Sequence, residues 1–186
     1  PSDAQLANQI LLEESRCHFP SFTASDAITL GLSLRKRFRG SSRHAKGGHG
    51  LVLTIQTIAG HTLFSCTVGD LADTPDVSLE SWAALEGIVD VVRKTAHASY
   101  YGTYSAISAL GKAPKQMGFP DDKIGRLAGG GYPIWLSNAP CCPIAIVACY
   151  SGSSLEDHLL VSTTVRDYLA KIAGGGAVPA PPPRMP

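Results

Sequence analysis

Two runs of β-branched and apolar residues, separated by a short turn, constrain the fold of this chain most strongly. The segment LVLTIQTIAGHTLFSCTV, residues 51–68, is rich in Leu, Val, Ile and Thr, and Ala59-Gly60 interrupts it near its middle. β-Branched residues favour strands, and two such runs joined by a short glycine-containing turn are typical of a β-hairpin. The sequence therefore predicts a pair of antiparallel strands here.

Helical patterns precede this hairpin. Residues 2–16 begin with Ser2 and Gln5 in capping-box spacing and have apolar residues at helical intervals, which predicts a helix. A second helix is predicted after FPSF, with Ser25 as its N-cap and Gly40 at its end. Its apolar residues follow the i, i+3, i+4, i+7, i+11 spacing of one buried face, at Ala27, Leu30, Gly31, Leu34 and Phe38.

The rest of the chain alternates between loop, helix and strand patterns. We expect a loop at residues 41–50, whose His44 and His49 are interpreted as solvated residues in preference to metal ligands. Further elements are a helix over residues 78–97, a helical segment over residues 100–112, strands at Tyr132–Leu136 and Ile144–Tyr150, and a final helix from Leu155 to about Ile172, capped by Ser154.

Length and composition predict one soluble domain. At 186 residues, with 44% hydrophobic and 17% charged residues, the chain can bury a core without disulfides or metals. Its sequence contains no apolar run of the roughly 20 residues that cross a bilayer, and its N-terminus lacks a signal-peptide pattern. The five cysteines are irregularly spaced, so we expect reduced thiols in the cytoplasm. For the adjacent Cys141 and Cys142, a strand entrance is favoured over a soft-metal site.

Charge is unevenly distributed, although the net charge is only +1. Residues 35–46 are strongly basic, and the carboxylates of residues 70–90 follow. The basic stretch lacks interleaved aromatic residues and any nucleic-acid-binding motif, so we do not expect a nucleic-acid partner. Opposite charges in neighbouring segments can instead pair within the fold or between copies of it.

The C-terminal residues have the composition of a tail. We divide the chain into a single domain, residues 1–173, and a flexible Gly/Pro-rich tail, residues 174–186. The tail contains P-x-x-P-x-R from Pro179 to Arg184, a pattern that some SH3 domains bind. An SH3-type partner is thus a candidate, although an unspecific tail is the favoured interpretation.

Several short motifs, taken in order, resemble one known family. They are FPSF, LFSCTVGD, Trp82, RKTAHAS around His97, GGGYPI, and SG followed by Asp157-His158. Together they resemble the haem-degrading, HbpS-like and GlcG-like family, especially its uncharacterised cytosolic branch, over about residues 5 to 170. Ordered agreement along most of the chain is more specific than any single motif.

The resemblance implies an α/β fold, a profilin-like sandwich in which helices flank an antiparallel sheet, and assembly into a homo-oligomer. Some relatives bind and degrade haem and others have no established activity, so haem is the candidate cofactor and none is certain. Ser81 and the AALEG after Trp82 replace polar and basic residues of the cytosolic branch, and Ala98 replaces a serine of its His-Ser-Ser motif. We therefore expect a less basic, more apolar pocket than that of the relatives.

Three residues are candidates for catalysis. His97 can act as acid or base near neutral pH or as an iron ligand, and the alternative is a histidine that favours a helix C-terminus. Asp157 and His158 are neighbours on a helix and point about 100° apart, so we do not expect them to form a dyad with each other, although either could meet His97 across the fold. For Asp157, a structural role in the first turn of the helix is the favoured interpretation. Candidate ligand-binding residues are Trp82, Arg93, Ser99, Tyr101, Gly130, Gly131 and Tyr132.

The sequence favours a homo-oligomeric protein that binds a small ligand near His97, Trp82 and the Gly129–Gly131 turn. That ligand is haem, another tetrapyrrole or an apolar metabolite, and enzyme status stays open. The first alternative is a cofactor-independent enzyme of the isomerase, lyase or cyclase type, acting on an apolar metabolite. The second is an oligomeric interaction protein that presents its Pro-rich tails to partners.

Overall fold

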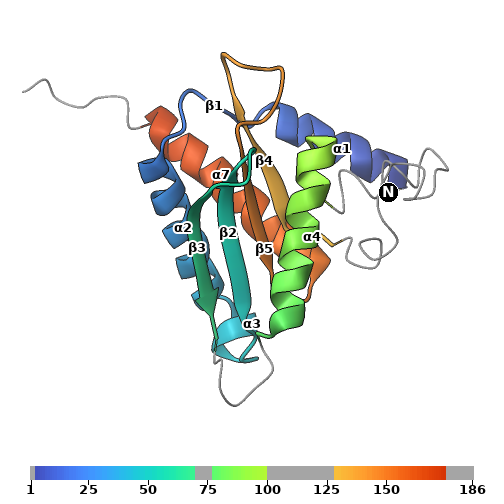
Figure 1. Ribbon diagram of the computed structural model, residues 1–186, viewed down its shortest axis with the longest axis vertical. Coiled ribbons are helices and arrows are strands. Elements are labelled where there is room, and N and C mark those ends of the chain that lie inside the picture. Colours follow the sequence, from blue (N-terminus) through green and yellow to red (C-terminus); the bar gives the residue numbers. More distant parts are fainter. Residues whose placement is uncertain (1–2, 70–76, 100–127, 175–186) are drawn as a thin grey trace, which may run out of the picture.

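The protein is described by a computed structural model over residues 3–69, 77–99 and 128–174 (Figure 1). Along these residues the elements are α1 (Asp3–Ser15), β1 (His18–Phe19), α2 (Ala24–Arg39), α3 (Ser42–Ala45), β2 (Leu51–Thr57), β3 (Thr62–Val68), α4 (Leu79–Thr95), β4 (Gly131–Leu136), β5 (Ala145–Tyr150) and α7 (Ser154–Gly174).

The sheet has five strands in the order β1-β4-β5-β2-β3. β2 and β3 form the predicted hairpin, in which Leu51 pairs with Val68, and β5 lies antiparallel on the other edge of β2. β4 and β5 are also antiparallel, whereas the two residues of β1 pair parallel to β4. The predicted antiparallel sheet is confirmed, and β1 is a short addition that strand patterns do not reveal, because two residues are too few to show alternation.

Helices cover both faces of the sheet. In Figure 1, α4 crosses the near face, and α2 and α7 lie behind it. β2 shows the two-residue alternation that this arrangement requires, because Leu51, Leu53 and Ile55 join the core cluster of α2 and α7. Val52, in contrast, joins the cluster that α4 buries. The predicted α/β sandwich is therefore confirmed.

α2 buries the face predicted from its periodicity, comprising Ala27, Leu30, Gly31, Leu34 and Phe38. Its beginning differs from the prediction, because the N-cap is Thr23 and not Ser25. The Thr23 hydroxyl accepts from the Asp26 N–H at 3.2 Å, and the Asp26 carboxylate accepts from the Thr23 N–H at 2.7 Å. This reciprocal pair satisfies two N–H groups at once, which Ser25 inside the first turn cannot do.

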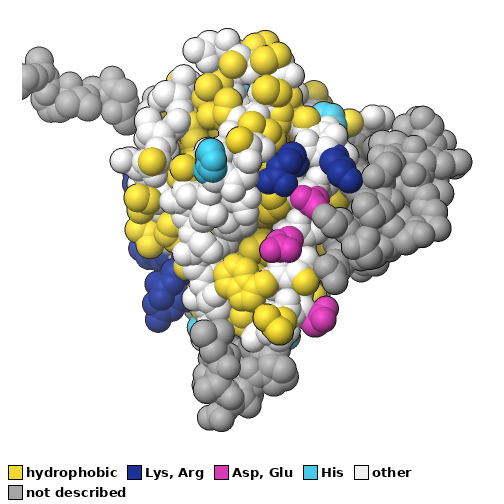
Figure 2. Space-filling view, in the orientation of Figure 1, with side chains coloured by type: hydrophobic (Ala, Val, Ile, Leu, Met, Phe, Trp, Pro, Cys, Tyr) yellow, Lys and Arg dark blue, Asp and Glu magenta, His cyan; other side chains and the backbone are white. Residues whose placement is uncertain are grey.

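Residues 41–50 were expected to be a loop, and that expectation is corrected in part. The Ser41 hydroxyl accepts from the His44 N–H and begins the short helix α3. Arg43 in α3 forms an ion pair with Glu156 of α7 at 2.8 Å, and Arg37 of α2 pairs with Asp167 of α7. The basic stretch therefore pairs within the fold with the last helix. Over α4, Figure 2 shows the basic side chains near the upper end of the helix and acidic side chains below them.

Some predictions fall outside the described residues. The helical segment at residues 100–112, with Tyr101, and the Pro-rich motif Pro179–Arg184 are among them. α7 ends at Gly174, so the division into domain and tail stays a prediction. Within the described ranges, no helix has the length and apolar character needed to cross a membrane.

Candidate functional site

His97 lies where the chain leaves α4 and meets α1. The helix ends at Thr95, and the left-handed conformation of its C-cap, Ala96 (φ 59°), redirects the backbone. The next residue then places its imidazole against α1, where His97 Nδ1 lies 2.8 Å from Glu14 Oε1. The second oxygen of Glu14 accepts from the Ala98 N–H at 2.9 Å. One carboxylate thus holds both the ring and the backbone of this turn.

The two residues of the Glu14–His97 pair differ in exposure, and the carboxylate shifts the pKa of the imidazole. Glu14 is only 4% exposed, whereas the His97 side chain is 47% exposed. The hydrogen bond to Glu14 is the main reason that the pKa of His97 is raised, and burial of the ring opposes it in part. With Nδ1 directed to the carboxylate, Nε2 is the ring atom left to contact a ligand or exchange a proton.

A cavity of about 320 Å³ adjoins this pair. His18 and Trp135 form part of its wall, and their rings stack with centroids 6.2 Å apart. The parallel pairing of β1 with β4 puts these two residues in register, which explains why they lie side by side. The remaining lining residues are Leu11, Ser15 and Pro140. The cavity therefore combines an apolar wall with two imidazoles and one buried carboxylate.

Asp157 does not belong to this site. It is 1% exposed and accepts from the Ser151 N–H at 2.8 Å, from the Ser151 hydroxyl, and from Arg43 at 3.5 Å. Burial is the largest cause of its raised pKa, and the bonds from Ser151 and Arg43 counter it. This carboxylate joins α3 and β5 to the first turn of α7.

His158 points in a different direction from Asp157, because neighbouring residues on a helix lie about 100° apart. It is 5% exposed, and burial lowers its pKa, while the charges of Glu13 and Glu14 oppose that shift. The carboxylates of α1 therefore act on both His97 and His158. Of the three predicted catalytic residues, these two histidines share Glu14 as an electrostatic neighbour.

Ser99 is hydrogen-bonded to the segment that contains Gly130 and Gly131. The Ser99 hydroxyl donates to the Ala128 carbonyl at 2.7 Å and accepts from the Gly131 N–H at 3.0 Å. Gly130 has φ 112°, and a Cβ on Gly131 would lie 2.6 Å from a methyl group of Val92. The turn thus allows β4 to approach α4 closely.

The other predicted ligand-binding residues lie apart from His97. Trp82 packs on the α4 core cluster, about 20 Å of helix away from Thr95 at the other end. The Arg93 guanidinium donates to the Ile58 carbonyl at 3.1 Å and pairs with Asp90 at 3.0 Å, which ties α4 to the hairpin. Tyr132 lines a different cavity, on the α7 side.

Sequence reasoning did not find Glu14, His18 or Trp135. One signal for Glu14 was present, because Ala7, Ile10 and Glu14 follow the i, i+3, i+7 spacing of a single face and all are buried. A carboxylate on an apolar helical face requires a hydrogen-bonding partner, which here is His97. Within the described residues, no group of three or more His, Cys, Asp or Glu side chains could hold a metal ion.

Comparisons with known proteins agree with the fold. No family model matches the sequence. A UPF0303 protein of Brucella melitensis is 28% identical over 180 residues, which cover 95% of this chain and 95% of that protein. The similarity to this relative therefore extends over nearly the whole length of both chains.

Solved structures show the same architecture. The Ybr137w protein superimposes with a TM-score of 0.73 at 20% identity, covering 90% of this chain and 89% of that chain. HbpS has a TM-score of 0.50 at 19% identity, covering 83% and 92%. The haem complex of PduOC has a TM-score of 0.50 at 18% identity, covering 73% and 88%. At the level of the fold, the resemblance to the HbpS-like and GlcG-like family is confirmed.

Proposed function

We propose that this chain, which has the fold of the HbpS-like and GlcG-like proteins, binds a small and largely apolar ligand in the cavity beside His97. The observation that carries the proposal is the buried Glu14 carboxylate, which holds Nδ1 of His97 at 2.8 Å at the edge of that cavity. A carboxylate behind an imidazole fixes the ring orientation and raises the basicity of the other nitrogen. The ring is thereby oriented to present Nε2 to a ligand.

The ligand chemistry follows from the lining. Leu11, Trp135 and Pro140 offer apolar contacts, and His18 adds a second imidazole beside Trp135. Small-molecule sites commonly combine such an apolar wall with a few polar groups that orient the ligand. We expect an apolar skeleton with one polar group that meets His97.

Haem fits this lining only in part. PduOC is known in complex with haem, and an imidazole held by a carboxylate is a suitable iron ligand. The described residues that line the cavity include no Lys or Arg, however, so no cation would pair with the propionates. An uncharged apolar metabolite therefore fits the lining better than a tetrapyrrole does. Haem is still the first ligand to test.

We also propose that the protein is a homo-oligomer. Large apolar side chains are exposed on two helices that pack together, at Ile28 and Leu32 of α2 and at Leu155 and Leu159 of α7. Exposed apolar side chains of this kind favour association between copies. Light scattering of the purified chain measures its mass directly, and a monomeric mass would contradict this part of the proposal.

A titration with haem, followed by absorbance, tests the site. If a tetrapyrrole is the ligand, wild type gives a saturable Soret shift, and His97→Ala weakens binding at least about tenfold. The matched control is His61→Ala, because His61 is an exposed histidine in the β2–β3 turn. Apolar metabolites are then tested in the same way by calorimetry. If neither haem nor any apolar metabolite loses affinity in His97→Ala, the proposed site is wrong.

The Glu14–His97 pair also favours a second function, acid–base catalysis without a cofactor. In an isomerase-type reaction, Nε2 of His97 would take a proton from one carbon of the substrate and return it to another. Glu14 would stabilise the imidazolium formed between these steps. Turnover that His97→Ala abolishes and Glu14→Gln lowers, with substrate binding retained, would favour this function over binding alone.

A further inference from the structure

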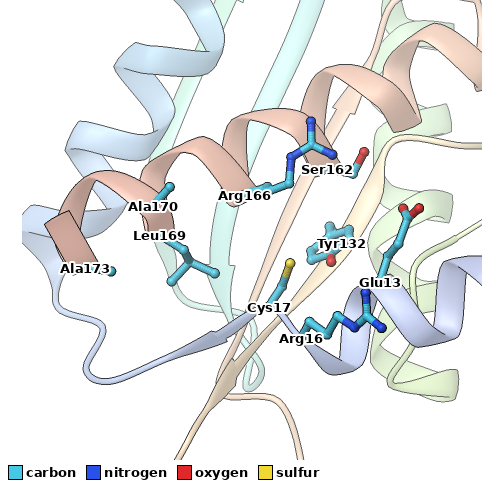
Figure 3. Close-up of a pocket in the computed structure, with 9 residues that line it drawn as sticks. All are labelled: Glu13, Arg16, Cys17, Tyr132, Ser162, Arg166, Leu169, Ala170 and Ala173. Carbon is cyan, nitrogen blue, oxygen red and sulfur yellow. The ribbon is translucent and has the colours of Figure 1, made fainter.

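A second cavity, of about 520 Å³, lies between α1, β4 and α7 (Figure 3). Glu13 lines this cavity, whereas the next residue, Glu14, lines the His97 cavity. Neighbours on a helix point about 100° apart, so α1 separates the two spaces. The volume falls within the range of about 300–1,000 Å³ that small-molecule sites occupy.

Two arginines face this cavity. Arg16 extends from the chain just after α1, and Arg166 extends from α7. Among the described residues, neither guanidinium group has an ion-pair or hydrogen-bond partner. Arg37, Arg43 and Arg93, in contrast, each pair with a carboxylate of this chain. The cavity arginines are therefore available to an external anion.

The acidic residue of the lining does not neutralise these arginines. The Glu13 carboxylate accepts a hydrogen bond from Gln9 Nε2 at 3.1 Å, one turn earlier in α1. Two guanidinium groups and one carboxylate leave the cavity with a surplus positive charge. An anionic ligand is thus favoured over a neutral or cationic one.

Tyr132 supplies a neutral donor at the base of the cavity. Tyr132 is 3% exposed, and in Figure 3 it lies beside Cys17, with Arg166 on one side of it and Arg16 on the other. Burial, and next the neighbouring Cys17, raises the pKa of the phenol well above its usual value. The hydroxyl therefore keeps its proton and can donate to a ligand oxygen.

The far end of the cavity is apolar. Leu169, Ala170 and Ala173 line it from the last turns of α7, and Figure 3 shows them away from the two guanidinium groups. A charged end and an apolar end in one cavity match a molecule that has both. Arginine binds carboxylates bidentately through its planar fork, and the alanines leave room for a hydrocarbon chain.

We propose that this cavity binds an amphipathic monocarboxylate, with its head between Arg16 and Arg166 and its hydrocarbon chain along Leu169, Ala170 and Ala173. The site is independent of the ligand proposed at His97. The Tyr132 hydroxyl donates to the same head group, and no covalent step is involved.

Calorimetric titration with octanoate tests the proposal. We expect saturable binding to wild type, and binding at least about tenfold weaker in the double variant Arg16→Gln/Arg166→Gln, because each lost pair is a charge-assisted hydrogen bond. Arg39→Gln is the matched control, since Arg39 is an exposed arginine on α2 outside this cavity. His97→Ala should bind octanoate as wild type does, which distinguishes this site from the proposed function.

Two further comparisons distinguish the contribution of the ligand's carboxylate head from that of its hydrocarbon chain. Ala170→Glu places a negative charge in the cavity at an exposed position, so the fold should persist while octanoate affinity falls about tenfold. Acetate and inorganic phosphate carry the charge without the chain, and octanol carries the chain without the charge, so all three should bind more weakly than octanoate. The proposal is overturned if wild type does not bind octanoate, if the double variant binds it normally, or if acetate or phosphate binds equally well.

Discussion

Replacing Glu14 with Gln removes the negative charge that holds His97, while the side chain keeps nearly the same shape. In the wild type the carboxylate accepts from His97 Nδ1 at 2.8 Å and from the Ala98 N–H at 2.9 Å. The amide oxygen of Gln can still accept from Ala98, but the ionic part of the bond to His97 is lost. The pair can therefore be tested with little change in packing.

The expected coupling energy between Glu14 and His97 follows from how exposed the two side chains are. A hydrogen bond to a charged group contributes about 1.5–3 kcal/mol when buried, and an exposed ion pair contributes up to about 1 kcal/mol. The Glu14 side chain is 5% exposed and that of His97 is 47% exposed, so solvent screens one end of the pair. We expect a coupling energy of about 1 kcal/mol between the two side chains at pH 6.

The stabilisation by the Glu14–His97 pair should decrease as pH rises. The pKa of His97 is raised in the folded state above its usual value of 6.5, so the folded protein binds this proton more tightly than the unfolded chain does. The stabilisation is fully present below about pH 6.5 and is lost as pH rises through the higher folded-state pKa. The coupling energy should therefore fall below about 0.5 kcal/mol at pH 9.

Urea unfolding of wild type, Glu14→Gln, His97→Ala and the double variant measures this coupling at pH 6 and pH 9. His61→Ala serves as the control, because its effect should not depend on the residue at position 14. A coupling energy near zero at pH 6, or one that grows towards pH 9, would refute the reasoning.

Three further predictions concern stability, and each is checked by the same urea unfolding. Arg43→Ala should cost about 3 kcal/mol, because it leaves the buried Asp157 carboxylate without its cation, and a cost below about 1 kcal/mol would contradict that role. Gly131→Ala should cost about 1–3 kcal/mol, because its methyl group would lie 2.6 Å from a buried α4 side chain. Gly40→Ala should cost nothing, because φ there is −80° and the added methyl group would make only ordinary contacts, with carbonyl oxygens at 3.6 and 3.7 Å. Thr23→Ala should cost about 1 kcal/mol through loss of the α2 cap, and an unchanged midpoint would argue against the capping box.

Most secondary structure could be predicted because its signals are local. The buried face of α2 and the β2–β3 hairpin follow from periodicities of 3.6 and 2 residues, which sequence displays directly. The cap of α2 was misplaced by two residues, because Ser25 and Thr23 are both good caps and only the reciprocal bonds with Asp26 distinguish them. The strand β1 could not be predicted, because its two residues are extended only through pairing with β4.

The candidate site was predicted in part. His97 was identified from a motif, but its partner Glu14 lies 83 residues away in sequence, and no local pattern relates the two. Trp82 and His97 were grouped by their order in the motif set, and the length of α4 keeps them apart.

The amino-acid sequence by itself determined most of the helices and strands, the buried face of α2 and the candidate histidine, because hydrophobic periodicity and capping act over one or two turns. Only the tertiary structure decided that Glu14 meets His97, that Asp157 pairs with Arg43, and that Arg16 and Arg166 face one cavity. These pairings depend on how α1 and α7 cross the sheet. The way these helices cross is set by the burial of apolar area. This driving force is non-directional and acts between residues that are far apart in sequence, so no local sequence pattern reveals it.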